Sequence, residues 1–464
     1  MKRCLIPFFL IFFIVGCFFG PVKELKNQIE DTWDADTPIV PPTELIDISN
    51  SKKFSRLWTA HSGTESLWEI DANSYDIHTL GMFVYEDFLF TLNHDGLIKK
   101  FNLNTGSLLW EKDFNFKVSA GLSGDSDALY FATSEGDLWS LDHDGKKLWK
   151  TYVGGQVHVK PLPNTSFVVV KLNFNKFVQI NISDGSIKWD YQAPNPPLTI
   201  NYQGDMIFAN GVIYSGLPGG KLIAIEAETG SMIWEVNVAS PKGLTEIERA
   251  NDVTSQPVID GSIIYSVSSK GKITSFDRRT SQKIWDRTLS SFVGLNLYGN
   301  NLIVVHESGS IYSLNNEVGK SNWRNADLQY RNIGKGIIIE DLLSVGDFDG
   351  YLHLIDLFNG KISSRIKLSG SQILDNMISL GDNKLIAMDV DGNIFCIEIN
   401  DNVEIKSTEE INENDISNNT DLIDKVETRG HTQDKNYDET SESSWLDKLK
   451  IWKKDKASDD ENLL

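Results

Sequence analysis

One short pattern recurs along most of this chain and limits the folds open to it. An alternating strand leads into a polar turn, and a tryptophan usually follows four residues after the glycine of that turn. Copies of the pattern end at Trp110, Trp149, Trp189, Trp234, Trp285 and Trp323, and a degenerate copy ends at Ser364. Counted from Trp68, successive tryptophans lie 38 to 51 residues apart. A spacing of about 40 residues is typical of the four-stranded blades of a β-propeller.

The strand-turn-strand units that precede these tryptophans set the number of blades. Eight units can be counted, and their apolar residues alternate with a period of two, which indicates strands rather than helices. The last unit, residues 391–400, has no tryptophan after it, whereas Trp68 has no complete unit before it. We therefore predict an all-β fold, an eight-bladed β-propeller of four-stranded blades. The N-terminal strand, which contains Trp68, is expected to pair with the C-terminal strand and so close the ring.

The residues of the repeat have separate physical roles. Glycines such as Gly106 and Gly230 allow a positive φ in the tight turn between the third and outer strands. An Asn, Asp or Glu lies eight residues before most of the tryptophans, as at Asn102 and Asp277, and can accept hydrogen bonds from turn amides. Each tryptophan offers a large flat ring, which we expect to pack on the neighbouring blade.

The start of the chain differs from the repeat. Two basic residues precede an apolar run, residues 5–15, which is too short for a transmembrane helix and fits a secretory signal. Residues 14–17 read IVGC and resemble the bacterial lipobox. That resemblance implies cleavage before Cys17 and a lipid on its sulfur. Because Phe18 rather than Asp follows the cysteine, it also implies a place at the outer membrane, on its periplasmic face. The alternative is an ordinary signal with an incidental cysteine.

These features predict four segments. Residues 1–16 form a lipoprotein signal peptide, 17–53 a lipidated tether, 54–400 the propeller and 401–464 an acidic disordered tail. Within the tail, residues 444–454 could form a short amphipathic helix that touches a membrane surface or a partner. The alternative for this stretch is a transient helix in a solvated tail.

Charge and cysteine content narrow the functions further. The formal net charge is -21 and the sequence pI is about 4.8, so a nucleic-acid backbone would be repelled. Once Cys4 leaves with the signal and Cys17 carries lipid, Cys396 is the remaining cysteine, and an intramolecular disulfide is not possible. Cys396 lies in an apolar strand, where cysteine usually behaves as a small buried hydrophobe.

An enzyme of similar architecture has to be weighed. Repeats with a glycine turn and a docking tryptophan resemble those of the pyrroloquinoline-quinone dehydrogenases, which are eight-bladed enzymes that hold a quinone and a calcium ion. That family carries a vicinal disulfide beside the cofactor, and this chain has no adjacent cysteines. Acidic turns at residues 347–350 and 389–392 imitate the start of a calcium loop but occupy the turn position of the repeat. We find no nucleophile elbow, HExxH motif or phosphate loop. We therefore predict no catalysis, no cofactor and no metal site.

An insertion interrupts the repeat at its longest interval. Residues 241–261 include the block TEIERANDV at 245–253, and extra loop length on a rigid scaffold often carries function. Together with the lipobox and the eight repeats, this block resembles the BamB family, lipoproteins of the outer-membrane β-barrel assembly machinery (BAM), over about residues 54–400. The resemblance implies a non-enzymatic scaffold that binds the periplasmic (POTRA) domains of BamA and other BAM components, and that aids insertion of outer-membrane proteins.

The resemblance also implies two adjacent contact loops, one at residues 198–201 and one that runs through Asp252. Leu198 and Ile200 match apolar contact positions of the family, and Asp252 matches an acidic one. Asn201 replaces a common arginine, which removes a bidentate charged contact, and Thr254 replaces a common second aspartate. The predicted partner-binding residues are Leu198, Ile200, Asn201, Glu246, Arg249, Asp252 and Thr254.

Alternatives stay open for these residues and for the whole chain. Glu246, Arg249 and Asp252 could instead form internal salt bridges that hold the insertion against the ring. The chain could be a propeller lipoprotein with another envelope partner, such as a polymer, or a quinone-dependent dehydrogenase. The residues favour a monomeric propeller, held at the outer membrane by the lipid on Cys17, that serves as a docking platform and binds no nucleic acid.

Overall fold

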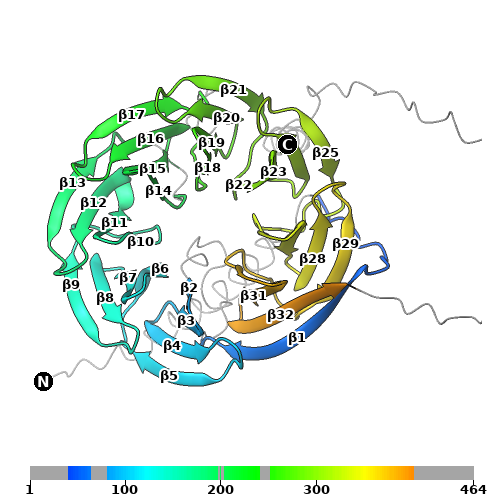
Figure 1. The fold of residues 1–464 in the computed structure, drawn as a ribbon, viewed down its shortest axis with the longest axis horizontal. Coiled ribbons are helices and arrows are strands. Elements are labelled where there is room, and N and C mark those ends of the chain that lie inside the picture. The colour runs from blue at the N-terminus through cyan, green and yellow to red at the C-terminus, as the bar shows by residue number, and fades with distance from the viewer. Residues whose placement is uncertain (1–39, 64–80, 197–198, 200–202, 241–250, 402–464) are drawn as a thin grey trace, which may run out of the picture. The chain divides into compact units, whose positions relative to one another are not determined.

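The computed structural model describes residues 40–63, 81–196, 199, 203–240 and 251–401. These residues form eight four-stranded antiparallel sheets, arranged in a ring as the blades of a β-propeller (Figure 1). The predicted eight-bladed all-β fold is therefore confirmed. Contacts divide the chain into two units, residues 1–403 and 404–464, and every described residue belongs to the first. The predicted signal peptide, Cys17 and the acidic tail after Asp401 lie outside the described residues.

Each blade is an up-and-down meander, with its first strand nearest the centre of the ring and its fourth at the rim (Figure 1). The first blade contains β2 (Gly81–Tyr85), β3 (Phe88–Leu92), β4 (Leu97–Asn102) and β5 (Leu108–Asp113). The second contains β6 (Val118–Gly124), β7 (Ala128–Thr133), β8 (Asp137–Asp142) and β9 (Lys147–Tyr152). The third contains β10 (Leu162–Pro163), β11 (Phe167–Lys171), β12 (Lys176–Asn181) and β13 (Ile187–Gln192), with a short 3₁₀ turn, η3 (Asn173–Asn175), before β12. The fourth contains β14 (Ile207–Ala209), β15 (Val212–Leu217), β16 (Lys221–Glu226) and β17 (Met232–Asn237).

The remaining blades repeat this arrangement. The fifth contains β18 (Val258–Asp260), β19 (Ile263–Val267), β20 (Lys272–Asp277) and β21 (Lys283–Thr288). The sixth contains β22 (Leu295–Tyr298), β23 (Asn301–Val305), β24 (Ile311–Asn315) and β25 (Ser321–Asn325). The seventh contains β26 (Ile337–Ile339), β27 (Leu342–Gly346), β28 (Tyr351–Asp356) and β29 (Ile362–Lys367). The eighth contains β30 (Ile378–Gly381), β31 (Lys384–Met388), β32 (Asn393–Asp401) and β1 (Lys52–His61). No helix among the described residues has the length and apolar character needed to cross a membrane.

The eighth blade joins the two ends of the ring. Its outermost strand is β1, which pairs antiparallel with β32 along its whole length. The predicted closure is confirmed, but the prediction that Trp68 belongs to the closing strand was wrong, because that strand contains Trp58. The connection that follows, residues 62–80, is long and stretches the repeat interval, so spacing alone pointed to a tryptophan beyond the strand.

Eight apolar clusters hold the blades together, and each takes its residues from two neighbouring blades. Successive side chains of a central strand face opposite neighbours. In β11, Val168 and Val170 pack toward the second blade, whereas Val169 packs toward the fourth. Because neighbouring blades cover both faces of each sheet, the second strand of a blade is buried along almost its whole length. Its sequence is therefore a nearly continuous apolar run, as in β7 and β11.

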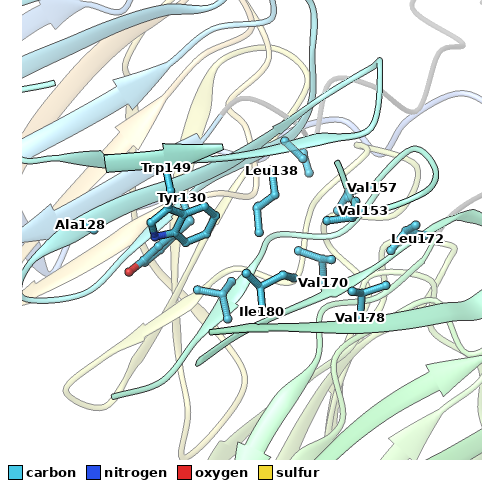
Figure 2. Close-up of a cluster of buried hydrophobic side chains, with 13 residues drawn as sticks. Ala128, Tyr130, Leu138, Trp149, Val153, Val157, Val170, Leu172, Val178 and Ile180 are labelled. Atoms are coloured by element: carbon cyan, nitrogen blue, oxygen red, sulfur yellow. The ribbon is translucent and has the colours of Figure 1, made fainter. Parts of the chain in front are cut away.

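Figure 2 shows the cluster between the second and third blades. Tyr130 and Trp149 lie against each other at one end, with ring centroids 6.0 Å apart. The cluster continues through Leu138 toward Val157 and Leu172 at the other end. Full burial of one such side chain contributes about 1.5–3 kcal/mol. We therefore expect the interfaces between blades to supply most of the stability of the ring.

The repeated tryptophans also join each blade to the next by hydrogen bonds. Among the described residues, six indole N–H groups donate to a backbone carbonyl of the following blade, at 2.8–3.0 Å. The acceptor is always the first residue after the third strand of that blade. The pairs are Trp58–Leu103, Trp149–Ile182, Trp189–Ala227, Trp234–Arg278, Trp285–Asn316 and Trp323–Leu357. The predicted docking of tryptophan on the neighbouring blade is confirmed for five of these residues, and Trp58, which the repeat did not single out, makes the sixth contact.

The glycine of the turn lies against the indole ring of the preceding blade. Gly230 has a φ of 74°, in the left-handed region, as the sequence predicts. A Cβ atom added there would lie 2.5 Å from Cδ2 of Trp189, which is too close. The same close approach occurs at Gly106, Gly185, Gly319 and Gly360. The turn and the indole that packs on it both favour glycine at this position. The fifth blade has Ser281 there instead, with a φ of 59°, and its turn still accepts the indole of Trp234.

Trp110 departs from the pattern for a local reason. Its indole N–H is buried and makes no hydrogen bond among the described residues. The equivalent acceptor, the carbonyl of His143, accepts instead from Nζ of Lys100 at 3.1 Å. Lys100 belongs to the same blade as Trp110, and its ammonium group also lies over the ring of Phe88. Lys100 therefore donates to the carbonyl that an indole N–H reaches at the equivalent position of six other blades.

In the seventh blade, the N-terminal segment lies where the repeat has no tryptophan. Ser364 occupies the tryptophan position, is fully buried, and its Oγ accepts a hydrogen bond from the backbone N–H of Lys52 at 2.8 Å. Beside it, Asn50 and Arg365 exchange two hydrogen bonds. Farther along, Arg331 donates to the carbonyl of Thr43 at 3.2 Å. The chain therefore enters the ring along β29 before it forms β1.

Replacement of Gly230 by alanine tests the contact between glycine and indole. Gly211, in the same blade, also has a positive φ, but a Cβ atom added there would meet nothing within 4 Å. Gly211→Ala should cost about 1–2 kcal/mol from the left-handed backbone alone. Gly230→Ala should cost about 1–3 kcal/mol more because the ring of Trp189 must move. Urea unfolding followed by tryptophan fluorescence measures both, and equal losses would contradict the proposed contact.

A tryptophan introduced at position 364, where the repeat lacks one, should destabilise the protein. In Ser364→Trp, the indole needs space that Lys52 and its neighbours fill, so the N-terminal segment should be displaced from β29 at a cost of about 1–3 kcal/mol. Trypsin should then cleave after Lys52 or Lys53 faster than in the wild type. Ser126→Trp, at an exposed turn, is the matched control and should leave the cleavage rate unchanged. Equal protection in Ser364→Trp and the wild type would contradict this role for the segment.

Candidate functional site

The two ends of the blades carry different connections. Turns between the first and second strands and between the third and fourth strands lie at one end, which we call the hairpin face. Turns between the second and third strands lie at the other end with the connections between blades, and we call this end the loop face. The two predicted contact loops fall within residues 193–206 and 238–257, which connect β13 to β14 and β17 to β18. The strands that these two connections join end and begin at the loop face, on either side of the fourth blade.

The structure describes two of the seven predicted partner-binding residues. Leu198, Ile200, Asn201, Glu246 and Arg249 lie outside the described residues, and their roles stay predictions. Asp252 and Thr254 are described, and each is 1% exposed. Their burial limits how a partner could reach them in this conformation.

Asp252 holds the insertion to the fourth blade. Its Oδ1 accepts a hydrogen bond from the backbone N–H of Gly219, in the turn between β15 and β16, at 2.8 Å. Its own carbonyl accepts from the N–H of Ser269 in the fifth blade at 2.8 Å. These contacts hold the insertion against the ring through backbone N–H groups, whereas the internal alternative for Asp252 was a salt bridge.

Thr254 extends the same anchorage to the next connection. Its hydroxyl donates to the carbonyl of Phe292 at 2.8 Å, in the segment between β21 and β22. A neutral hydroxyl can donate such a hydrogen bond, whereas the carboxylate that the resemblance implies at this position can only accept. Thr254 therefore has a local structural role.

A buried lysine close to these residues was missed by the sequence analysis. Lys171, the last residue of β11, is fully buried, and its Nζ donates to the carbonyl of Gly216 in the fourth blade at 2.6 Å. Desolvation lowers the pKa of Lys171 to about 7, and the carboxylates of Asp252 and Asp205 oppose this shift. The available signal was a lone lysine in the apolar run of residues 167–172. Lys171 thus joins the third blade to the fourth beside the contact loops.

Comparison with known proteins places the chain in a family. A family model described as outer membrane protein assembly factor BamB matches residues 94–325. BamB of Bordetella pertussis is 29% identical over 344 residues, which cover 74% of this chain and 86% of that protein. BamB of Shewanella oneidensis is 31% identical over 296 residues, which cover 61% of this chain and 75% of that protein. The chain belongs to the BamB family. The resemblance to BamB drawn from the sequence is confirmed.

Solved structures agree with this assignment at the level of the fold. The crystal structure of BamB from Moraxella catarrhalis has a TM-score of 0.67 at 21% identity, and the match covers 75% of this chain and 100% of that one. The quinohemoprotein alcohol dehydrogenase of Comamonas testosteroni has a TM-score of 0.58 at 10% identity, and the match covers 76% of this chain and 78% of that one. The propeller is thus shared between BamB proteins and quinone enzymes, and likeness at these identities concerns the fold alone.

The buried lysine predicts a pH-dependent stability. Because the pKa of Lys171 is lowered from 10.5 to about 7 in the folded state, the unfolded chain binds more protons between these values. The contribution of this group to the unfolding free energy should therefore rise with pH across that window and be lost as the pH falls toward 7. Urea unfolding at several pH values should give a flatter profile for Lys171→Met than for the wild type. Lys146→Met, which removes an exposed lysine, should keep the wild-type profile, and a parallel profile for Lys171→Met would refute the assignment.

Proposed function

We propose that this chain is a non-enzymatic scaffold in outer membrane protein assembly, and that its loop face binds the periplasmic (POTRA) domains of BamA. Family membership supports the first part, since the relatives are named outer membrane protein assembly factors. The observation that supports the second part is that the strands flanking both predicted contact loops end or begin at the loop face, on either side of the fourth blade.

The residues of the proposed docking surface have two kinds of role. Leu198 and Ile200 provide the apolar contact, and Asn201, Glu246 and Arg249 provide polar contacts around it. Asp252 and Thr254 act from below the surface, because their hydrogen bonds to Gly219 and Phe292 fix the course of the second loop. A rigid loop loses less conformational entropy on binding, which favours affinity.

Membrane attachment is the second element of the proposal. Residues 1–16 act as the signal peptide, Cys17 carries the lipid, and residues 17–53 tether the propeller of residues 54–400 to the periplasmic face of the outer membrane. Residues 401–464 form an acidic tail. The described part of the tether is consistent with this order, since residues 43–51 lie against the seventh blade directly before β1.

The lack of a reaction is the third element. The relatives are named as assembly factors, and this supports a scaffold over the quinone enzymes that share the fold. The sequence also lacks the adjacent cysteines of those enzymes. No cofactor is needed by a scaffold that works through its surface.

Binding to the BamA periplasmic region from the same genome tests the proposal. Isothermal titration with the full chain should give a measurable affinity, and Ile200→Ala and Leu198→Ala should each weaken it by about 5- to 30-fold if they are central apolar anchors. Asp252→Ala should weaken binding together with a loss of stability, because its carboxylate positions the loop. Val318→Ala is the matched control, since Val318 is 65% exposed on the hairpin face.

Two outcomes would count against the proposal. If the wild type does not bind BamA, the proposed partner is wrong, and the alternative of a propeller lipoprotein with another envelope partner is favoured. If the wild type binds but Ile200→Ala and Leu198→Ala bind equally well, the docking surface lies elsewhere on the propeller.

A further inference from the structure

A polar pocket of about 280 Å³ opens on the loop face between the third and fourth blades. Its wall is built from separate connections: Gln156 follows β9, residues 173–175 form η3, Gln203 precedes β14, and Pro218 follows β15. Thr199, which lies between the apolar contact residues of the first predicted loop, also lines it. The pocket therefore borders the proposed docking surface without being part of the apolar contact.

Two side chains that line the pocket, those of Asn175 and Gln203, have buried amide oxygens that accept no hydrogen bond from the described residues. Asn175 is fully buried, and its Nδ2 donates to Oδ1 of Asn195 at 2.7 Å, but its own Oδ1 has no hydrogen-bond partner in the described part of the chain. Oε1 of Gln203 is likewise buried and has no partner there. Buried carbonyl oxygens are nearly always paired, so this pocket calls for a group that donates.

An aromatic ring stands at the rim of the same pocket. Phe174 is 66% exposed and has a φ of 56°, a left-handed backbone that bulky residues seldom adopt. Other blades place glycine in this turn, as at Gly96 and Gly309, whereas η3 has none. The carbonyl of Phe174 accepts from Nε2 of Gln192 at 2.5 Å, which helps to hold the turn. A strained backbone that presents an exposed ring is a feature of binding sites.

Unpaired acceptors beside an aromatic face favour an occupant that donates hydrogen bonds and can lie on a ring, and His158, Asn173 and Asn195 complete the lining. A guanidinium group carries five N–H donors and no acceptor, and its planar shape allows it to lie on a ring while it donates at its edge. Aromatic faces attract cations, and the chain has a net charge of -21, which favours a basic partner. A neutral amide would bring an acceptor of its own into a wall that already has two.

We infer that this pocket receives an arginine side chain of the protein that docks on the loop face, with Phe174 beneath the guanidinium group and the oxygens of Asn175 and Gln203 as its acceptors. The inference deepens the proposed function and rests on it for the identity of the partner. It assigns to the third blade a specificity pocket beside the apolar contact.

A probe that does not depend on BamA tests the chemistry of the pocket. The full chain is prepared with 4-fluorophenylalanine at position 174, and its ¹⁹F resonance is followed while acetyl-Gly-Arg-Gly-amide is added. The resonance should shift saturably, and the matched peptide with citrulline, which is neutral and of the same shape, should produce no shift. The label at position 358 is the control, because Phe358 is 70% exposed on the hairpin face. Equal shifts with both peptides, or none with either, would overturn the inference.

Affinity for the BamA periplasmic region then tests the role of the pocket in docking. Phe174→Ala should weaken binding about two- to five-fold through loss of the cation–aromatic contact. Gln203→Glu should strengthen binding at low salt, and the gain should shrink as salt is added. Gln203→Lys should weaken it, and Phe358→Ala should leave it unchanged.

The outcomes separate this inference from the proposed function. A wild type that does not bind BamA refutes the proposed partner, while the fluorine result still decides whether the pocket takes arginine. A wild type that binds, together with Phe174→Ala and Gln203→Lys variants of unchanged affinity, refutes the pocket alone.

Discussion

The propeller depends on one repeated contact, in which an indole N–H donates to a turn carbonyl of the next blade. A glycine in that turn leaves room for the indole. A single four-stranded sheet has two apolar faces and cannot cover either of them alone. The indole joint sets one sheet against the next in the orientation that allows their faces to pack. Among the described residues, eight interfaces between blades, six of which have this joint, each contain an apolar cluster and together bury both faces of the central strands. The closed ring leaves no sheet edge free at its seam.

The exceptions to the joint follow from the same constraint. Ser364 replaces tryptophan in the blade that precedes the seam, where the following blade has no turn between its third and fourth strands, because β32 and β1 come from opposite ends of the chain. The N-terminal segment fills the space, and its Lys52 amide bonds to Ser364. Trp110 has a turn to reach, but Lys100 occupies the carbonyl. A copy of the repeat that lacks the tryptophan or its hydrogen bond therefore marks a place where another part of the chain contacts the outer strand or the acceptor carbonyl.

The joints also explain where function can be accommodated. They engage the turns of the hairpin face, so connections on the loop face can lengthen without disturbing the contacts between blades. The insertion before β18 uses this freedom, and Asp252 and Thr254 fasten it to the neighbouring connections. The sequence placed these residues in a contact loop but could not decide whether they face a partner or the ring, since an acidic residue in a loop is compatible with both. Lys171, Asn175 and Gln203 carried no repeat signal. The role of Lys171 depends on a contact with the next blade, and those of Asn175 and Gln203 arise only where four connections converge.

The sequence alone determined the blade number, the turn chemistry and the family, because each depends on residues at fixed spacing along the chain. It did not identify the closing tryptophan, because Trp68 lies 42 residues before Trp110, near the usual spacing, whereas Trp58 lies 52 residues before it. Tertiary structure decided which side chains of the loop face are turned inward and which are offered to solvent. That outcome depends on contacts between residues far apart in the chain, such as Lys171 with Gly216 and Asp252 with Gly219, which no local pattern encodes.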